Sequence, residues 1–243
     1  MRISVVRFLA IIVGGIFVLS AIGTAALFAW PRPSFEMAEP RDFSWPLAPL
    51  LEGMYSTTIR PDGKLEIALQ HAPLPGVTPE MLAWWYQQLP LGHHTIDAET
   101  YTYYHLFHAS EHGVIKVIEA GEGPGISKGA LIARRERFGS FYSKGQARVI
   151  SIGSEGMIVS PEIASLHFGH IEHSFSSGPN GAIYSVHAVL GSDLPLLGPV
   201  INLYLRNRLF PEPVLSEWMR HQTEEVGSLP YYLPGLYRQA TEQ

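Results

Sequence analysis

The segment that decides the fold lies near the C-terminus and reads Trp218-Met219-Arg220-His221-Gln222-Thr223-Glu224-Glu225-Val226-Gly227. The pattern before it turns helical after Pro199, runs through Phe210, breaks at two prolines and resumes up to Gly227. In a helix, His221 and Glu225 lie one turn apart on the same face, so both side chains can reach one point. An imidazole and a carboxylate at this spacing suit half of a zinc site, although the same spacing is common on solvated helix surfaces.

The chain before this helix has the pattern of an antiparallel meander. Thr78 to Leu89 predicts a helix, because a threonine cap and a proline precede apolar residues at helical spacing. Residues 100–119 are rich in tyrosine, valine and isoleucine and predict two strands or one long bent strand. Four more strands are predicted at Ala130–Phe138, Ala147–Ser151, Ser165–Phe175 and Ala182–Leu190. A helix, a meander and a long C-terminal helix together predict an α+β fold.

Composition excludes several kinds of partner and site. The 243 residues are enough for a sizeable core, and a net charge of -5 without a basic stripe argues against nucleic acid as a partner. The chain contains eleven histidines and no cysteine, so a bound metal must be held by nitrogen and oxygen.

The N-terminal region predicts a membrane anchor. Phe8 to Trp30 runs without a charge and is long enough to cross a hydrocarbon core of roughly 30 Å as a helix. We interpret residues 1–30 as this anchor, residues 31–50 as a proline-rich linker, and residues 51–243 as a catalytic domain on the non-cytoplasmic side of the membrane. The alternative is a signal peptide cleaved near Ala26, which leaves a secreted or periplasmic protein.

A second candidate for metal binding is the stretch His108-Ala-Ser-Glu111-His112. It matches the H-x-x-E-H pattern of zinc peptidases in which both histidines bind from one helix. Its flanks favour strands, however, and Gly113 would cut a helix short. In an extended chain His108 and Glu111 point to opposite faces, which leaves His108 as the single ligand from this stretch. Histidines without any ligand role are the alternative.

Two further groups can contribute to a site. In the first of the four later strands, Glu136 lies on the apolar-leaning face, where a carboxylate needs a metal ion or Arg134 as its partner. Further on, His167 and His173 share one face of a predicted strand and His170 takes the other. These histidines can act as acid or base, because an ordinary histidine has a pKa near neutrality.

Taken in their order along the chain, these motifs resemble those of the diacetylphloroglucinol hydrolase family. Its members are zinc enzymes that cut a carbon–carbon bond between an acyl group and a polyhydroxylated ring. The resemblance covers residues 50–240. It rests on Glu80-Met-Leu-Ala-Trp-Trp85, on Tyr104-His-Leu-Phe-His108, and on Trp218 through Glu225 with Leu233-Pro-Gly-Leu-Tyr237. It implies a helix-grip (Bet v 1-like) fold, in which a curved antiparallel sheet wraps round a long C-terminal helix.

The resemblance also implies a cofactor and its ligands. The cofactor is Zn²⁺, and the matching motifs assign its ligands to His108, Glu136, His221 and Glu225.

The remaining implied roles concern substrate and protons. His173 is the histidine expected to protonate the carbon leaving group, with His170 and His167 as alternatives. Tyr104 or Tyr101 is expected to hold substrate oxygens. Glu111 stands where the family carries an asparagine, which changes recognition of a phenolic oxygen and places Glu111 among the catalytic candidates.

The expected function is a membrane-anchored, zinc-dependent hydrolase that cleaves a carbon–carbon bond of an acyl-aromatic or related cyclic ketone. One alternative is a helix-grip binding protein that holds a hydrophobic small molecule without catalysis and needs no metal. The other is a zinc peptidase built on His108, Glu111 and His112.

Overall fold

The computed structural model describes residue 15, residues 33–37 and residues 39–242. The predicted anchor, or the alternative signal peptide, therefore lies outside the described residues except for residue 15. Among the described residues, no helix is both long and apolar enough to cross a membrane. The proline-rich segment up to residue 50 contains no helix or strand where it is described, and its Phe43, Trp45 and Leu50 pack against the core of the domain.

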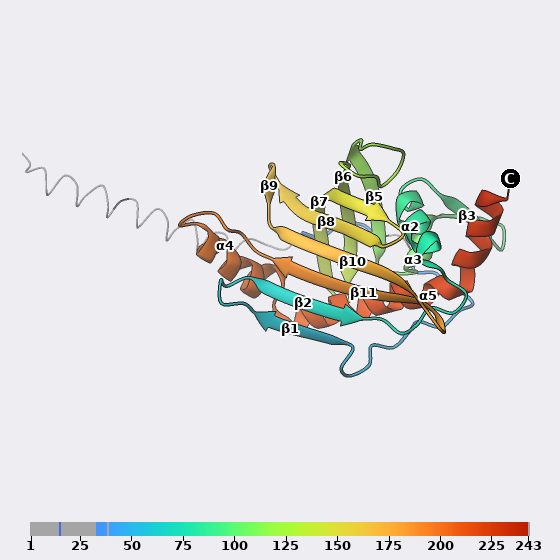
Figure 1. The fold of residues 1–243 in the computed structure, drawn as a ribbon, viewed down its shortest axis with the longest axis horizontal. Coiled ribbons are helices and arrows are strands. Elements are labelled where there is room, and N and C mark those ends of the chain that lie inside the picture. Colours follow the sequence, from blue (N-terminus) through green and yellow to red (C-terminus); the bar gives the residue numbers. More distant parts are fainter. Residues whose placement is uncertain (1–14, 16–32, 38, 243) are drawn as a thin grey trace, which may run out of the picture. The chain divides into compact units, whose positions relative to one another are not determined.

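Within residues 39–242 the domain is built on a nine-stranded sheet in which all paired strands run antiparallel (Figure 1). The strands are β1 (Tyr55–Ile59), β2 (Leu65–Gln70), β5 (His112–Glu119), β6 (Leu131–Phe138), β7 (Phe141–Gly153), β8 (Gly156–Ile163), β9 (Leu166–His167), β10 (Gly169–Gly178) and β11 (Gly181–Leu190). Their order in space is β1-β2-β11-β10-β8-β7-β6-β5, with β9 attached to β8. The long-range pairing of β2 with β11 joins the first hairpin to the meander.

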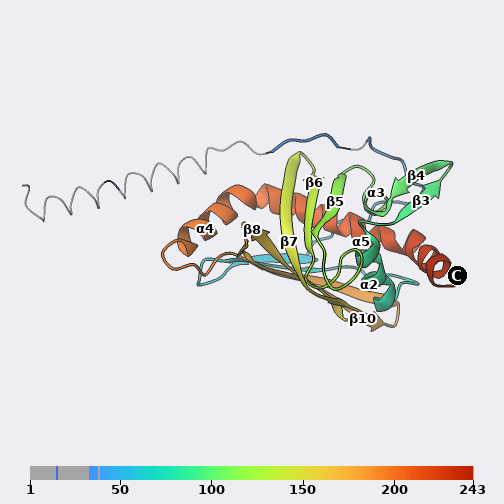
Figure 2. The same ribbon diagram turned by 90° about the horizontal axis from the view of Figure 1, so that it is seen from above.

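Helices cover one face of this sheet. They are α2 (Pro79–Gln88), α3 (Tyr103–Phe107), α4 (Gly198–Tyr204), the π-helical turn η1 (Leu205–Leu209) and α5 (Glu212–Thr241), and a separate hairpin is formed by β3 (His93–Ile96) and β4 (Glu99–Thr102). Figure 2 shows α5 running along the face of the sheet. A large antiparallel sheet with a long C-terminal helix is therefore confirmed.

Side-chain alternation places the core between α5 and the sheet. On β2, Leu65, Ile67 and Leu69 are buried, while the residues between them are more exposed. On α5, the buried positions include Trp218 and Met219, which belong to the same core cluster. Any polar group on these inward positions is removed from water and needs a partner.

Local sequence signals predicted some elements well. The Thr78 side chain caps α2 by accepting a hydrogen bond from the backbone N–H of Met81 at 3.3 Å. The predicted strands Ala130–Phe138 and Ala182–Leu190 match β6 and β11 to within one residue. The strand predicted for Ser165–Phe175 is instead interrupted at Phe168, between β9 and β10.

The two strands predicted within residues 100–119 are present as β4 and β5, but the prediction missed the helix and the turn between them. Thr102 ends β4 and caps the short helix α3, because its hydroxyl accepts a hydrogen bond from the His105 N–H at 3.1 Å. A turn then leads into β5, which begins only at His112. The helix and turn change the direction of every side chain from Tyr104 to Glu111.

The end of the C-terminal helix was also predicted wrongly. Gly227 does not stop α5, which continues through Pro230 and Pro234 to Thr241. The reason for the glycine is a close contact, because a Cβ atom at Gly227 would lie only 2.2 Å from the Cβ of Ala48. The glycine lets the N-terminal segment approach the helix backbone.

Candidate metal centre

The predicted pair on α5 faces the interior. His221 is fully buried and Glu225 is 4 % exposed, and both project towards the β5–β6 end of the sheet. The helical spacing of four residues brings the His221 Nε2 within 2.9 Å of the Glu225 Oε1. The two side chains therefore do reach one point, as their spacing predicts.

His112, the first residue of β5, completes this contact. Its Nε2 lies 2.5 Å from the Glu225 Oε1 and 3.3 Å from the His221 Nε2. The residue is 1 % exposed, so water cannot solvate this group. Two imidazoles and a carboxylate thus converge in a buried space.

The Nδ1 atoms of His112 and His221 point away from Glu225, and each has a partner of its own. The Nδ1 of His112 donates to the backbone carbonyl of Tyr104 at 2.6 Å, and the Nδ1 of His221 faces the Glu111 Oε2 at 2.8 Å. A proton on each Nδ1 leaves a lone pair on each Nε2. Two such lone pairs and a carboxylate oxygen repel one another unless a proton or a metal ion lies between them. Metal-bound histidines are held in this manner, with the other ring nitrogen donating to a carboxylate or a carbonyl.

The separation of the two nitrogens fits a small tetrahedral ion. Nitrogen ligands about 2.0–2.1 Å from a tetrahedral zinc lie roughly 3.3–3.4 Å apart. The distance between the two Nε2 atoms is 3.3 Å, whereas the Glu225 Oε1 lies at hydrogen-bonding distances of 2.5 and 2.9 Å from them, so this carboxylate would have to shift to share an ion with both imidazoles. The donor set of imidazole nitrogen and carboxylate oxygen also suits zinc.

Glu136 on β6 is the fourth member of the group. It pairs with His112 across the β5–β6 ladder, and one ligand atom each from His112, Glu136 and His221 lie within 4.8 Å of one another. Its Oε2 accepts a hydrogen bond from the Tyr104 hydroxyl at 2.8 Å, and Arg134 forms an ion pair with its Oε1. Arg134, the alternative partner considered for Glu136, is therefore in place, and Tyr104 adds a second one.

His108 lies beside this group and not in it. Its Nδ1 accepts hydrogen bonds from the backbone N–H groups of Ser110 and Glu111, at 3.3 and 3.2 Å. The proton must then sit on Nε2, which lies 3.0 Å from the Glu224 Oε2. The His108 ring is stacked on that of His221, and His108, Glu111 and His221 form a second buried group whose ligand atoms lie within 4.8 Å of one another, although the His108 Nδ1 already accepts two hydrogen bonds.

Glu111 bonds to the outer nitrogen of the His221 ring. Its Oε1 accepts from the Gly139 N–H at 2.9 Å and from Arg220 at 2.5 Å, while its Oε2 faces the His221 ring. Burial alone would raise the pKa of Glu111, but the hydrogen bond to His221 and the nearby cations lower it to about 2. An ionised Glu111 with three partners orients His221.

The electrostatic surroundings favour one cation at the point of convergence. Burial lowers the pKa of His112 to about 4. Burial acts in the same direction on His221, but Glu225 and Glu111 outweigh it and raise the pKa of His221 to about 9. Burial would also raise the pKa of Glu225, yet the two imidazoles hold it well below its usual range.

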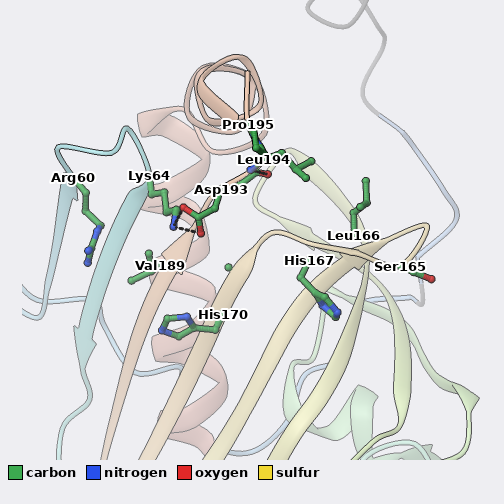
Figure 3. Close-up of a pocket in the computed structure, with 13 residues that line it drawn as sticks. Arg60, Lys64, Ser165, Leu166, His167, His170, Val189, Asp193, Leu194 and Pro195 are labelled. Carbon is green, nitrogen blue, oxygen red and sulfur yellow. Dashed lines mark hydrogen bonds and ion pairs between the residues drawn. The ribbon is translucent and has the colours of Figure 1, made fainter. Parts of the chain in front are cut away.

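The three evenly spaced histidines end in different places. His173 on β10 faces the interior, where its Nδ1 lies 2.6 Å from the Tyr184 hydroxyl, and burial lowers its pKa to about 4. His170 lies three positions earlier on the same strand and so takes the outer face. His167 is exposed at β9 and lines an open groove of about 650 Å³ (Figure 3).

Sequence reasoning missed several inward residues. Tyr184 contacts both His173 and the Tyr86 hydroxyl. His71 is 5 % exposed, its ring lies 4.8 Å from that of Tyr184, and its Nε2 has no hydrogen-bond partner. His71 continues the inward alternation of β2, so the strand parity was the signal that could have found it. Glu224, the partner of His108, carried no signal in the sequence.

Comparisons with known proteins find solved structures that resemble this chain only distantly. No protein-family model and no curated protein matches the chain. Among solved structures, Ara h 8.0201 has 12 % identity and a TM-score of 0.42 over 74 % of this chain and 99 % of its own. KanY (ms6282) has 12 % identity and a TM-score of 0.42 over 70 % and 96 %, and MLL2253 from Mesorhizobium loti has 9 % and 0.40 over 69 % and 98 %. TM-scores at this level carry no argument about function. The proposed function is therefore argued from the buried side chains.

Proposed function

We propose that the chain is a zinc-dependent hydrolase whose metal is held by His112, Glu136, His221 and Glu225. The observation that supports it most is the convergence of two buried imidazoles on the Glu225 carboxylate, each with its Nδ1 bonded elsewhere. His112 takes the place that the sequence assigned to His108, because the lone pair of His108 is already used. The sheet with its long C-terminal helix is the arrangement that the helix-grip resemblance implies.

The expected substrate is an acyl-aromatic or related cyclic ketone, as in the family that the sequence resembles. Zinc held by these residues would supply a Lewis acid for a carbonyl or a water, and with four protein ligands this would require a fifth coordination position or displacement of one carboxylate. Tyr104 donates a hydrogen bond to Glu136 and so holds this carboxylate from the side of α3. His173 is neutral at physiological pH because of its lowered pKa, so it must first take up a proton before it can protonate a leaving carbon.

Metal analysis of matched variants tests the ligand set. We expect about one zinc per chain in the wild type, loss of most of it in His112→Ala, and retention in His108→Ala, because only the former has a free lone pair. The two histidines lie four residues apart and both are buried, which makes each a control for the other. Zinc that depends on His108 and survives loss of His112 contradicts the assignment.

A panel of acylated phenols and cyclic diketones, with esters and peptides alongside, tests the reaction. Release of a carboxylic acid from a ketone, abolished by a chelator and restored by zinc, supports it. His173→Ala should keep its zinc and lose turnover by roughly 10²–10⁴-fold if this histidine transfers the proton. Turnover of esters or peptides alone argues against the carbon–carbon hydrolase.

A binding protein without catalysis is the second candidate, and one observation favours it. A mostly apolar pocket of about 440 Å³ lies beside α5, lined by residues that include Met54, Leu74, Tyr231 and the buried His71. Pockets of this size and lining hold drug-sized apolar ligands. Tight binding of an apolar compound by metal-free protein, with no turnover of any ketone, selects this candidate.

The zinc peptidase reading is not supported by the backbone. It needs both histidines of His108-Ala-Ser-Glu111-His112 on one helix, whereas α3 ends at Phe107 and His112 begins a strand. Glu111 is also fully occupied by Gly139, Arg220 and His221, so it is not free to act as a base.

A further inference from the structure

The candidate metal centre is buried, so a substrate needs a route to it. His112, His221 and Glu225 are each at most 4 % exposed. The open groove of Figure 3 borders the outer face of the sheet, where His170 lies, and so does not lead inside. The pocket of about 440 Å³ beside α5 instead reaches His71, which belongs to the interior.

We call this second pocket the α5 pocket, and packing fixes its walls. Its lining residues come from segments 48–54 and 71–75 and from one face of α5, at Thr223, Gly227, Pro230 and Tyr231. Ala48 packs against Gly227, where a Cβ atom would lie only 2.2 Å from the alanine Cβ. The ring of Trp45 stacks on that of Tyr231 at a centroid distance of 6.4 Å. The segment before β1 is therefore held against the helix and forms the outer wall.

The lining of the α5 pocket favours a neutral ligand. In the part of the chain that the structure describes, the lining residues include no aspartate, glutamate, lysine or arginine. The Thr223 hydroxyl is already engaged, because it donates to the Met219 carbonyl at 2.8 Å. A charged ligand would lose its hydration here without gaining an ion pair.

His71 brings an unsatisfied hydrogen-bonding group to the inner end of the pocket. Its side chain is buried, and its Nε2 has no hydrogen-bond partner among the described residues. Burial lowers the pKa of His71 to about 3, so the ring is neutral at physiological pH. A neutral imidazole has one donor and one acceptor nitrogen, and a hydroxyl group can pair with either. A ligand hydroxyl therefore suits His71 in both tautomers.

Beyond His71 lie the polar groups next to the centre. Its ring is 4.8 Å from that of Tyr184, whose hydroxyl lies 2.6 Å from the His173 Nδ1. His173 and Glu225 are also near enough to act on the pKa of His71, the first lowering it and the second raising it. His71 thus stands between the α5 pocket and the residues proposed for catalysis.

We infer that the α5 pocket is the entrance to the buried centre and that His71 selects neutral aryl ketones that carry a ring hydroxyl. The inference rests on the proposed function for the aryl ketone, whereas the entrance and the preference for a hydroxyl come from the pocket itself. The apolar walls accept the ring, and the hydroxyl supplies the hydrogen bond that His71 lacks. A ketone of the same shape without the hydroxyl leaves the buried nitrogen unpaired, so it binds less well.

Equilibrium dialysis of the full-length protein against para-hydroxyacetophenone and para-methylacetophenone tests the role of His71. The two probes have nearly the same shape, and only the first can pair with the imidazole. The ratio of their affinities should fall by about fivefold in His71→Leu, because one neutral hydrogen bond is lost. His71→Gln should keep part of the preference, since its side chain can still form a hydrogen bond, and His187→Leu on the outer face should keep all of it.

A purely structural role of His71 would change both affinities alike, and circular dichroism checks that each variant folds. An affinity ratio that is unchanged in His71→Leu, or failure of the wild type to bind either probe, overturns the inference. Dialysis records binding and needs no turnover. Selective binding without turnover of any ketone therefore refutes the hydrolase and still supports the pocket.

The entrance is tested by blocking it. Because the chain has no cysteine, Leu51→Cys places a single thiol at the rim of the α5 pocket. Leu197→Cys is the matched control, since Leu197 does not line the pocket and is 61 % exposed, against 60 % for Leu51. Labelling with a pyrenyl maleimide should abolish most binding of para-hydroxyacetophenone in the first variant and leave it unchanged in the second. Binding or ketone turnover that survives complete labelling at position 51 overturns the entrance and leaves the hydrolase in place.

Discussion

Two regions of the domain use the same residue types in different surroundings. Between α5 and the sheet, His112, His221 and Glu225 are buried and bonded to one another. On the outer face, the His187 Nε2 lies 2.8 Å from the Glu66 Oε1, and both side chains remain more than 30 % exposed. Water can solvate the outer pair when it opens, but it cannot reach the inner one. Burial, and not residue type, makes the inner group a candidate metal centre.

The largest expected effect separates the two regions by metal content. His221→Ala should remove bound zinc, with a loss of affinity greater than the roughly 100-fold that follows from changing a supporting residue. His187→Ala should leave the zinc content unchanged, because His187 and its partner Glu66 lie on the outer face, where Glu66 also pairs with Arg60. Elemental analysis and competition with a chelator measure both. Equal metal loss in the two variants would remove the distinction between the regions.

The next effect concerns the support of the inner site. Glu111→Gln keeps the shape of the side chain but weakens its hold on the His221 Nδ1. Zinc affinity should fall by roughly 10–100-fold. Glu162→Gln is the control, since Glu162 is equally buried but bonds to Arg148 at 3.0 and 3.1 Å and not to the centre. If the control loses as much affinity, the effect is one of general stability.

Acid should destabilise the inner region in particular. Burial lowers the pKa of His173 to about 4 and that of His71, with the nearby His173, to about 3. The unfolded chain therefore takes up protons before the folded one, and the free energy of unfolding falls as the pH drops from about 6.5 towards these values. His71→Phe should reduce this pH dependence by up to about 1.4 kcal/mol per pH unit. Urea unfolding at several pH values measures it, and an unchanged pH dependence in His71→Phe contradicts the prediction.

The smallest effect on stability is expected from a change in the open groove that Lys64 and Asp193 line. The Lys64 Nζ lies 2.7 Å from Asp193, whose side chain is 85 % exposed. Exposed ion pairs contribute about 0–1 kcal/mol, so Lys64→Ala should change the melting temperature by no more than a few degrees. A larger loss would mean that the groove, like the interior, depends on its charges for stability.

The parts of the site that follow local geometry could be read from the sequence. His221 and Glu225 depend only on helical spacing, and Glu136 depends only on strand alternation. Both predictions place the side chains where the structure has them, facing the interior.

The proposed replacement of His108 by His112 as a ligand could not be predicted in the same way. Thr102 caps α3 and the following turn reorients His108, whose Nδ1 is then taken by two backbone N–H groups. That outcome depends on hydrogen bonds formed only in the folded chain. His71 was missed because no strand was predicted over Leu65–Gln70, whose inward alternation it continues.

The distribution of the four proposed ligands along the chain has a consequence for synthesis in the cell. His112 and Glu136 are made early, whereas His221 lies 109 residues after His112 and Glu225 follows it. A nascent chain that stops before His221 therefore holds at most half of the site. Metal loading should follow synthesis of α5 beyond Glu225, and a chain truncated before His221 should bind no zinc.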